Sequence, residues 1–221
     1  MSRNHDQRRK FGEPEAYIRR YVDFFNRIFY VDRRVYIPNH ETENMVSLLL
    51  EDLSEDSAVL DIGTGSGSIA ITVKKEMPLI KVYGSDIDPS TLDVARFNAE
   101  LHNADIRFFE SCYADDIPIE PTHIISDMPW GDERYVLGSN NLEEMKHLPP
   151  ISVFHPQGPL TAYKELIQSI QTKEWKPKLF FESGLVEKIE VENIIPKGME
   201  WDYIQFDDYS VTVVDFANQN T

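Results

Sequence analysis

Apolar runs alternate along this chain with amphipathic stretches, and the alternation predicts strands followed by helices. Short runs that begin near residues 58 and 81 each lead into a stretch with the three-to-four-residue spacing of a buried helix face. Further strands are predicted at residues 105–110, directly before residue 127, at 180–183, and as a closing antiparallel pair at 201–206 and 211–216. Strands that alternate with helices favour an α/β doubly wound sheet.

The first forty residues carry a different pattern. Residues 14–30 predict a helix, with an alternative break near Asn26, because four apolar side chains recur at helical spacing. These side chains are Ile18, Val22, Phe25 and Phe29. Pro38 interrupts the chain, and Glu41 begins a second predicted amphipathic helix. Its inward face comprises Met45, Leu48 and Leu49.

The sequence AVLDIGTGSGSIA, residues 58–70, predicts a strand, a tight turn and a helix. Glycines allow close approach of a ligand to the backbone, and the helix that follows offers unpaired amides. The loop residues with a predicted ligand role are Asp61, Gly63, Thr64, Gly65 and Gly67. A dinucleotide loop has the spacing G-x-G-x-x-G, whereas the spacing D-x-G-x-G-x-G here resembles the S-adenosylmethionine loop of Rossmann-like methyltransferases. A purely structural turn is the alternative interpretation.

Asp86 is the last residue of the next predicted strand. A helix is predicted to begin directly after it, because Asp88, Pro89 and Ser90 are typical of a helix N-terminus. Taken alone, Asp86 is also consistent with a turn or helix-capping residue. An acid at this place in nucleotide-binding folds accepts hydrogen bonds from the ribose hydroxyls, and Ile87 beside it is assigned to the same site. Together with the glycine loop, Asp86 indicates a nucleoside-type cofactor.

Composition narrows the function classes. The chain has 221 residues, with 22 basic and 38 acidic side chains and a formal charge of -16. This charge disfavours a nucleic-acid substrate, whose binding depends on neutralising phosphates. A single cysteine excludes an intrachain disulfide and a multi-cysteine zinc site, so no metal is expected. The sequence shows no membrane span and no signal-peptide core, which predicts a cytoplasmic protein, and the basic cluster near residues 3–10 is interpreted as a solvated tail.

The linker before the domain resembles that of the HemK/PrmC type of glutamine N-methyltransferases, which act on peptide-chain release factors. The matching residues are Tyr17, Ile18, Phe24, Phe29, Val31, Val35, Ile37, Pro38, Glu41, Thr42 and Glu43. The family has Arg and Pro where this chain has Asn39 and His40. The resemblance runs from about residue 14 to residue 183. It implies S-adenosyl-L-methionine as the cofactor and a Rossmann-like methyltransferase fold.

The resemblance also implies an adenine pocket after the third strand, at Ser111, Cys112 and Tyr113. Tyr113 is expected to stack on the adenine ring. The family usually has an aspartate where Cys112 stands, so the carboxylate that would accept from the adenine amine is replaced. We assign Cys112 and Tyr113 to the cofactor site.

The chemistry is expected at the end of the fourth strand, in the sequence DMPW at residues 127–130, where the family has NPPY. Asp127 and the Met128 carbonyl can each accept one hydrogen from a planar nitrogen, and Trp130 can stack on the flat group. Pro129 holds Met128 extended. Asp127 is also assigned to the cofactor. The alternative is that the Pro-Trp pair only ends the strand and covers the core.

These observations predict a Rossmann-like seven-stranded doubly wound sheet with a C-terminal antiparallel strand pair. Residues 1–40 are expected to form an N-terminal tail, helix and linker, and residues 41–221 the methyltransferase domain. The expected function is S-adenosylmethionine-dependent N-methylation of a planar amide or amine nitrogen of a protein, peptide or small molecule. A non-catalytic cofactor-binding or interaction module with a degenerate NPPY motif is the alternative. About a dozen residues precede the linker, where the family has a helical substrate domain, so a release-factor substrate is not expected.

Overall fold

A seven-stranded sheet forms the centre of the computed structural model, which describes residues 2–129, 142–158, 160–207 and 209–219. The strand order is β5-β4-β3-β6-β7-β9-β8. The strands are β3 (Ala58–Ile62), β4 (Lys81–Asp86), β5 (Arg107–Glu110), β6 (His123–Ser126), β7 (Lys178–Gly184), β8 (Met199–Gln205) and β9 (Ser210–Gln219). β3 to β7 pair in parallel, whereas β9 is antiparallel to both β7 and β8. The predicted fold class and the closing antiparallel pair are therefore confirmed.

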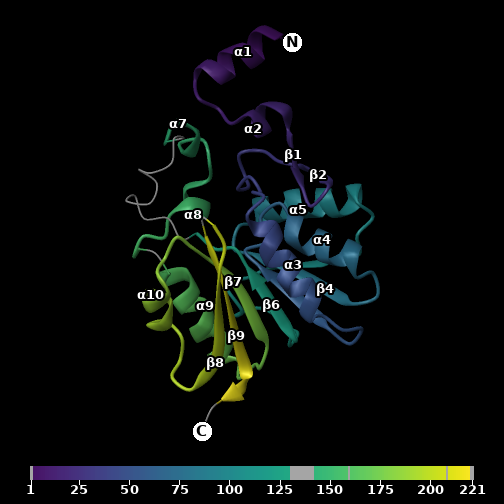
Figure 1. The fold of residues 1–221 in the computed structure, drawn as a ribbon. Helices are drawn as coiled ribbons and strands as arrows, with labels where there is room; N and C mark the ends of the chain where they lie inside the picture. Colours follow the sequence, from purple (N-terminus) through teal and green to yellow (C-terminus); the bar gives the residue numbers. More distant parts are fainter. Residues whose placement is uncertain (1, 130–141, 159, 208, 220–221) are drawn as a thin grey trace.

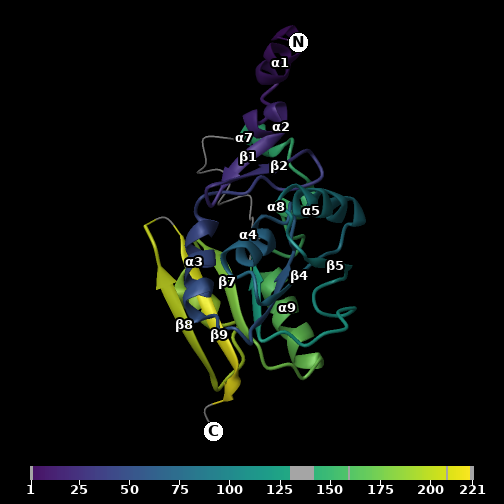
Figure 2. The ribbon, with the colours of Figure 1, turned by 90° about the vertical axis from the view of Figure 1, so that its right-hand side faces the viewer.

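Helices cover both faces of this sheet (Figure 1). On one side lie α3 (Thr42–Asp52), α4 (Ser68–Glu76) and α5 (Pro89–Leu101). On the other side lie α9 (Thr161–Thr172) and α10 (Lys188–Glu192). The short helices α7 (Leu142–Met145) and α8 (Pro150–Val153) lie near the N-terminal segment in both ribbon views (Figures 1 and 2). Within the described part of the chain, no helix combines the length and the apolar character needed to cross a bilayer.

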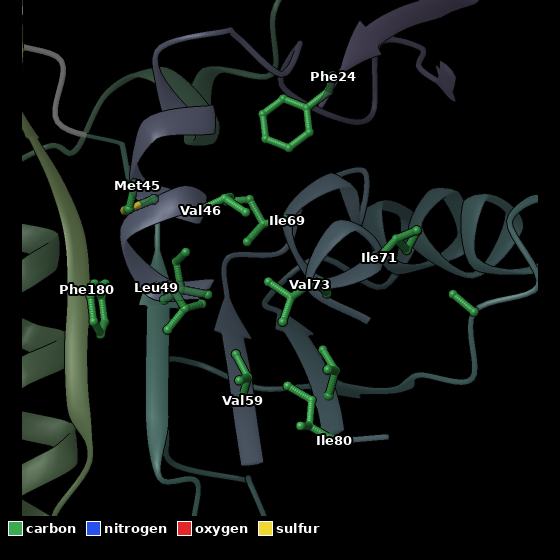
Figure 3. Close-up of a cluster of buried hydrophobic side chains, with 14 of the residues drawn as sticks. Phe24, Met45, Val46, Leu49, Val59, Ile69, Ile71, Val73, Ile80 and Phe180 are labelled. Carbon is green, nitrogen blue, oxygen red and sulfur yellow. The ribbon is translucent and has the colours of Figure 1, made fainter. Parts of the chain in front are cut away.

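Neighbouring side chains along each strand point to opposite faces of the sheet, which divides the core into two halves. Val59 and Phe180 point to the side of α3 and α4, where Figure 3 shows Met45, Leu49 and Val73 packed around them. The next residues along the same strands, Leu60 and Phe181, belong to the opposite half beneath α9. Both faces of the central strands are buried, which explains why these strands read as continuous apolar runs.

The carboxyl ends of the parallel strands meet at one edge of the sheet. The register pairs Ile62 with Ser85, and Asp86 with Glu110. It also pairs Ser126 with Phe181, so the residues that follow these two lie side by side. The loops after β3, β4, β5 and β6 therefore converge on one place.

The N-terminal segment differs from the expected helix over residues 14–30. Helix α2 (Glu15–Arg19) ends at Arg20, whose φ is 70°, and the chain continues as a hairpin of β1 (Tyr21–Phe24) and β2 (Arg27–Tyr30). Phe25 and Asn26 form its two-residue turn with positive φ, the geometry that suits a tight hairpin. The helix prediction is wrong beyond Arg19, because the apolar spacing also fits a strand pair with its buried phenylalanines, Phe24 and Phe29, facing α3 and α4.

Residues 2–10, expected as a tail, form helix α1 (Ser2–Lys10). Arg8 donates to both carboxylate oxygens of Glu13, at 2.5 and 2.7 Å. Arg33 lies 3.0 Å from the same carboxylate. These two cations hold the pKa of Glu13 at about 2, below its ordinary 4.5. The ion pairs tie α1 to the linker that precedes α3.

Candidate active site

The glycine loop joins β3 to α4 and lies over the end of β4. The amides of Gly63 and Thr64 both donate to the Ser85 carbonyl, at 2.9 and 2.8 Å. Gly63 and Gly67 have φ values of +75° and +80°, which glycine adopts without strain. A Cβ on Gly67 would lie 3.3 Å from the Ala95 backbone of α5, so this glycine also permits close packing of the two helices.

Asp61 is completely buried in β3 below this loop. Its Oδ2 accepts from the Thr64 hydroxyl at 2.6 Å and from the Ala70 amide at 3.2 Å. Its Oδ1 is buried and has no hydrogen-bond partner among the residues that the structure describes. Burial raises the pKa of Asp61 from 3.8 to about 7, because a carboxylate without water favours its neutral form. A buried carboxylate with one orphan oxygen is suited to receive a cationic or N–H-bearing group of a ligand.

Asp86 ends β4 and faces the loop from the opposite side. Its Oδ2 accepts from the Gly65 amide at 3.1 Å and its Oδ1 from the Asp88 amide, also at 3.1 Å. Burial raises the pKa of Asp86, and these backbone donors oppose the shift. The neighbouring Ile87 is half exposed, at 51%. The structure therefore brings the predicted pair of Asp86 and the glycine loop into direct contact.

The predicted adenine residues follow β5, next to Asp86. The Ser111 amide donates to the Asp86 carbonyl at 3.0 Å. The Cys112 thiol is exposed, and desolvation followed by nearby acids raises its pKa, which makes it a weaker nucleophile. Tyr113 has a φ of 50°, and its hydroxyl donates to Glu165 of α9 at 2.7 Å. This hydrogen bond joins the loop after β5 to α9.

The predicted catalytic sequence begins directly after β6, but Trp130 lies outside the described residues. Asp127 and Pro129 are partly buried. Met128 crosses toward the glycine loop, and a Cβ on Gly63 would lie 3.0 Å from its Sδ. The motif and the cofactor loop thus lie against each other, with the bare face of Gly63 accommodating the Met128 side chain.

Tyr163 of α9 holds the backbone of this motif. The Met128 amide donates to the Tyr163 hydroxyl at 2.8 Å, and the Met128 carbonyl lies 3.4 Å from the same oxygen. The Tyr163 ring is fully buried and stacks on Phe181 of β7, with ring centroids 4.4 Å apart. Sequence reasoning assigned Tyr163 no role.

Sequence reasoning missed a second carboxyl group beside Asp127. Glu182 follows Phe181 in β7, and the parallel register places it next to Asp127. The Thr42 hydroxyl at the start of α3 lies 3.2 Å from Asp127 Oδ2 and 3.0 Å from Glu182 Oε2. Glu182 is 2% exposed. The sequence does carry a signal for Glu182, because it is an acidic residue near the end of the apolar strand β7, which pairs with β6, the strand that precedes the motif.

The site is acidic throughout. Asp61, Asp86, Asp127 and Glu182 all have a raised pKa, with burial as the largest cause. None of them forms an ion pair with a Lys, Arg or His among the residues that the structure describes. Such an edge favours a ligand that carries positive charge.

Comparisons with known proteins agree with this geometry. A family model described as "Methyltransferase small domain" matches residues 38–137. The release factor glutamine methyltransferase of Staphylococcus aureus is 31% identical over 200 residues, which cover 86% of this chain and 69% of that protein. The chain belongs to the release factor glutamine methyltransferase family. The expected family is confirmed, and with it the class of S-adenosylmethionine-dependent methyltransferases.

A second member of this family, from Neisseria gonorrhoeae, is 37% identical over 172 residues, or 75% of this chain and 59% of that protein. Across four such relatives, the aligned region covers between 56% and 69% of the relative's length. Among solved structures, the hMettl16 catalytic domain matches with a TM-score of 0.66 and 15% identity, over 97% of this chain and 79% of that one. That likeness shows the shared fold.

The residues present suit the family's cofactor, S-adenosyl-L-methionine. If the cofactor binds at this edge, the Asp61 carboxylate would hold the ammonium of the methionine part, and Asp86 would hold the ribose hydroxyls. The bare backbone of the glycine loop leaves room for a ligand, since within the described part of the chain a Cβ on Gly65 would meet only the Gly63 carbonyl, at 3.9 Å. The acidic edge also matches the positive charge that the cofactor carries on sulfur and nitrogen.

Proposed function

We propose that the protein methylates a planar amide or amine nitrogen of a protein or peptide in the cytoplasm. The observation that carries this proposal is the contact between the catalytic motif and the cofactor loop, where Met128 Sδ lies against Gly63. When bound, the cofactor supplies a methyl group on a sulfonium; its transfer forms an N–C bond, breaks the S–C bond with the electron pair left on sulfur, and obliges the nitrogen to lose a proton.

The chain's own residues orient the nitrogen. The Asp127 carboxylate accepts one N–H and the Met128 carbonyl accepts the other, so the nitrogen lone pair is directed at the cofactor. Tyr163 fixes the Met128 peptide that carries this carbonyl. Alignment of two reactants in this way can lower a barrier by about 7–11 kcal/mol. Trp130 is assigned to stack on the flat acceptor group.

A glutamine side chain is the acceptor that the names of the relatives support, because they are release factor glutamine methyltransferases. The aligned region covers little more than half of several of these relatives, so we assign the class of acceptor, a protein or peptide, rather than the release factor itself. The Asp127 carboxylate, where the family motif has a neutral asparagine, extends this class to amines, because an anion stabilises a developing positive charge on nitrogen.

A transfer assay with methyl-labelled cofactor tests the proposal. The protein is incubated with the labelled cofactor and either a glutamine-containing release-factor peptide or a cell extract, and the labelled species is identified by mass spectrometry. We expect an N-methylated protein or peptide with the wild-type protein and at least about tenfold less label with Asp127→Ala. Binding of the cofactor with no transfer to any acceptor would instead establish the non-catalytic module.

A further inference from the structure

The Thr42 hydroxyl has one hydrogen, yet its oxygen lies within hydrogen-bond distance of three other oxygens. These are Asn39 Oδ1 at 2.8 Å, Glu182 Oε2 at 3.0 Å and Asp127 Oδ2 at 3.2 Å. The Asn39 oxygen is fixed as an acceptor, because the Thr42 amide also donates to it, at 2.9 Å. If both carboxyl groups were ionised, one hydrogen would have to serve three acceptors.

A proton on one of the carboxyl groups supplies a missing hydrogen, because a neutral carboxyl can donate to a lone pair of the Thr42 oxygen. Glu182 is the better place for the proton. It is 2% exposed, and Thr42 is its only hydrogen-bond partner among the described residues. Asp127 is only partly buried, so it is the group that can reach a ligand. One proton on Glu182 still leaves two hydrogens for three contacts, and a proton on Asp127 completes the set.

We propose that Asp127 and Glu182 form a carboxyl pair in which Glu182 holds a proton and donates it to Thr42, while Asp127 takes the proton that the acceptor nitrogen loses. This inference rests on the proposed function. The N–H bond breaks with its electron pair left on nitrogen, and an O–H bond forms at Asp127. The neutral Asp127 can then donate to the Thr42 oxygen. Asp127 is the catalytic residue, and Glu182 is a positioning residue that acts through it.

The electrostatic surroundings favour one proton on the pair. Burial raises the pKa of both carboxyl groups, and the charge of Asp127 raises that of Glu182 further, whereas Thr42 opposes both shifts. The other titratable groups that face the pair are acidic or phenolic. Among the described residues they are Glu41 before α3, Tyr36 of the linker, Asp61 of β3, Tyr163 of α9 and Tyr209 directly before β9. No cation among the described residues offsets a second negative charge.

The first test needs neither an acceptor nor turnover. Infrared difference spectra are recorded during a pH titration of the wild-type protein and of Glu182→Gln, whose amide reproduces the shape and the donor of a protonated Glu182. We expect a protonated-carboxyl band in the wild type that persists at a pH where Asp61 and Asp86 have ionised and that is absent in Glu182→Gln. A wild-type protein without this band, or a band that survives in Glu182→Gln, overturns the assignment.

The second test is the pH profile of methyl transfer. Glu182→Gln should keep its neutral-pH turnover within about threefold of the wild type and leave the acidic limb of the profile in place, because Glu182 is already neutral in the wild type where Asp127 titrates. Asp127→Asn should abolish that limb and lower turnover by at least about tenfold. Full turnover in Asp127→Asn, or a limb that moves to lower pH in Glu182→Gln, contradicts the pair, because a moved limb would mean that Glu182 is ionised in the wild type.

Thr42 supplies the matched control. Thr42→Val removes the hydroxyl that joins the two carboxyl groups and should move the limb, whereas Thr42→Ser keeps the hydroxyl and should restore the wild-type profile. Equal profiles in these two variants contradict the coupling of the two carboxyl groups through Thr42. The tests distinguish failure of the carboxyl pair from failure of the proposed methyl transfer. The infrared band without any methyl transfer supports the protonated Glu182 and refutes the proposed function, whereas methyl transfer without the band refutes the pair alone.

Discussion

Asp61→Asn should raise the stability of the cofactor-free protein and lower its affinity for S-adenosylmethionine. The amide keeps one oxygen to accept from Thr64 and Ala70, and it places an NH2 group where the carboxylate has an orphan oxygen. The substitution therefore removes a buried charge without removing its two hydrogen bonds. Opposite signs for stability and affinity are the mark of a group that is retained for a ligand.

The size of the effect follows from the pKa of Asp61, which burial raises from 3.8 to about 7. One unit corresponds to about 1.4 kcal/mol, so an ionised Asp61 costs the folded protein on the order of a few kcal/mol at neutral pH. Even about 1 kcal/mol of this would raise the Tm by about 2–4 °C in a chain of this length. The lost contact with the cofactor's ammonium should cost roughly 1.5–3 kcal/mol, which is about tenfold or more in Kd.

Two measurements on the same protein check this prediction. Thermal unfolding without cofactor gives the change in stability, and calorimetric titration with S-adenosylmethionine gives the change in Kd. Asp56→Asn is the matched control, because Asp56 is exposed and should change neither quantity. A lower Tm together with an unchanged Kd would refute the reasoning, since it would make Asp61 a structural carboxylate.

The remaining predictions concern the other residues of the site and the pH dependence of stability. Asp86→Ala should weaken cofactor binding by at least about tenfold, because the ribose hydroxyls lose a charged acceptor; an unchanged Kd by titration would place the ribose elsewhere. Tyr113→Phe should bind the cofactor almost normally, whereas Tyr113→Ala should lose about 1 kcal/mol or more, and full retention in both would remove Tyr113 from the adenine pocket. Tyr163→Phe should lower kcat more than cofactor affinity, because it frees the Met128 peptide; an unchanged kcat contradicts that role. Burial raises the pKa of Asp61 in the fold, so the stability that Asp61 contributes is full below its unfolded pKa of 3.8 and is lost as pH rises to about 7. The cofactor-free Tm should therefore fall between about pH 4 and about pH 7, and a rise over this range would contradict the sign.

The sequence was sufficient to predict the central sheet, because its strands and helices carry strong and distinct periodicities. Residues 58–86 combine two apolar runs with a glycine loop and an acid at the second strand end, and the structure joins Gly65 to Asp86 directly. The closing pair β8 and β9 was also read correctly from alternation. These features are local, so no knowledge of tertiary contacts was needed.

The N-terminal hairpin was missed because its apolar residues satisfy two periods at once. Ile18, Val22 and Phe29 fall on one helical face, yet Val22 and Phe29 are also cross-strand partners in the hairpin. The deciding contacts are distant in sequence. The Asn98 side chain of α5 accepts from the Tyr30 amide at 2.8 Å and donates to the Tyr30 carbonyl at 2.9 Å. A side chain 68 positions away thus pairs with the free backbone amide and carbonyl of β2, and no local sequence pattern predicts this contact.

The most informative difference between sequence and structure lies at Asp127. From the sequence, an aspartate in place of the family's asparagine is a substitution of a neutral acceptor by an anion at a ligand site. In the structure, that anion stands beside Glu182 and shares Thr42 with it, and no cation among the described residues compensates the two charges. The free-energy cost of burying the pair is higher when both carboxyl groups are ionised than when one of them is protonated. The substitution therefore changes more than one hydrogen bond, because it converts a fixed neutral acceptor into a group whose charge depends on its neighbour. A motif with asparagine can only orient the acceptor nitrogen, whereas a motif with this carboxyl pair can also remove its proton.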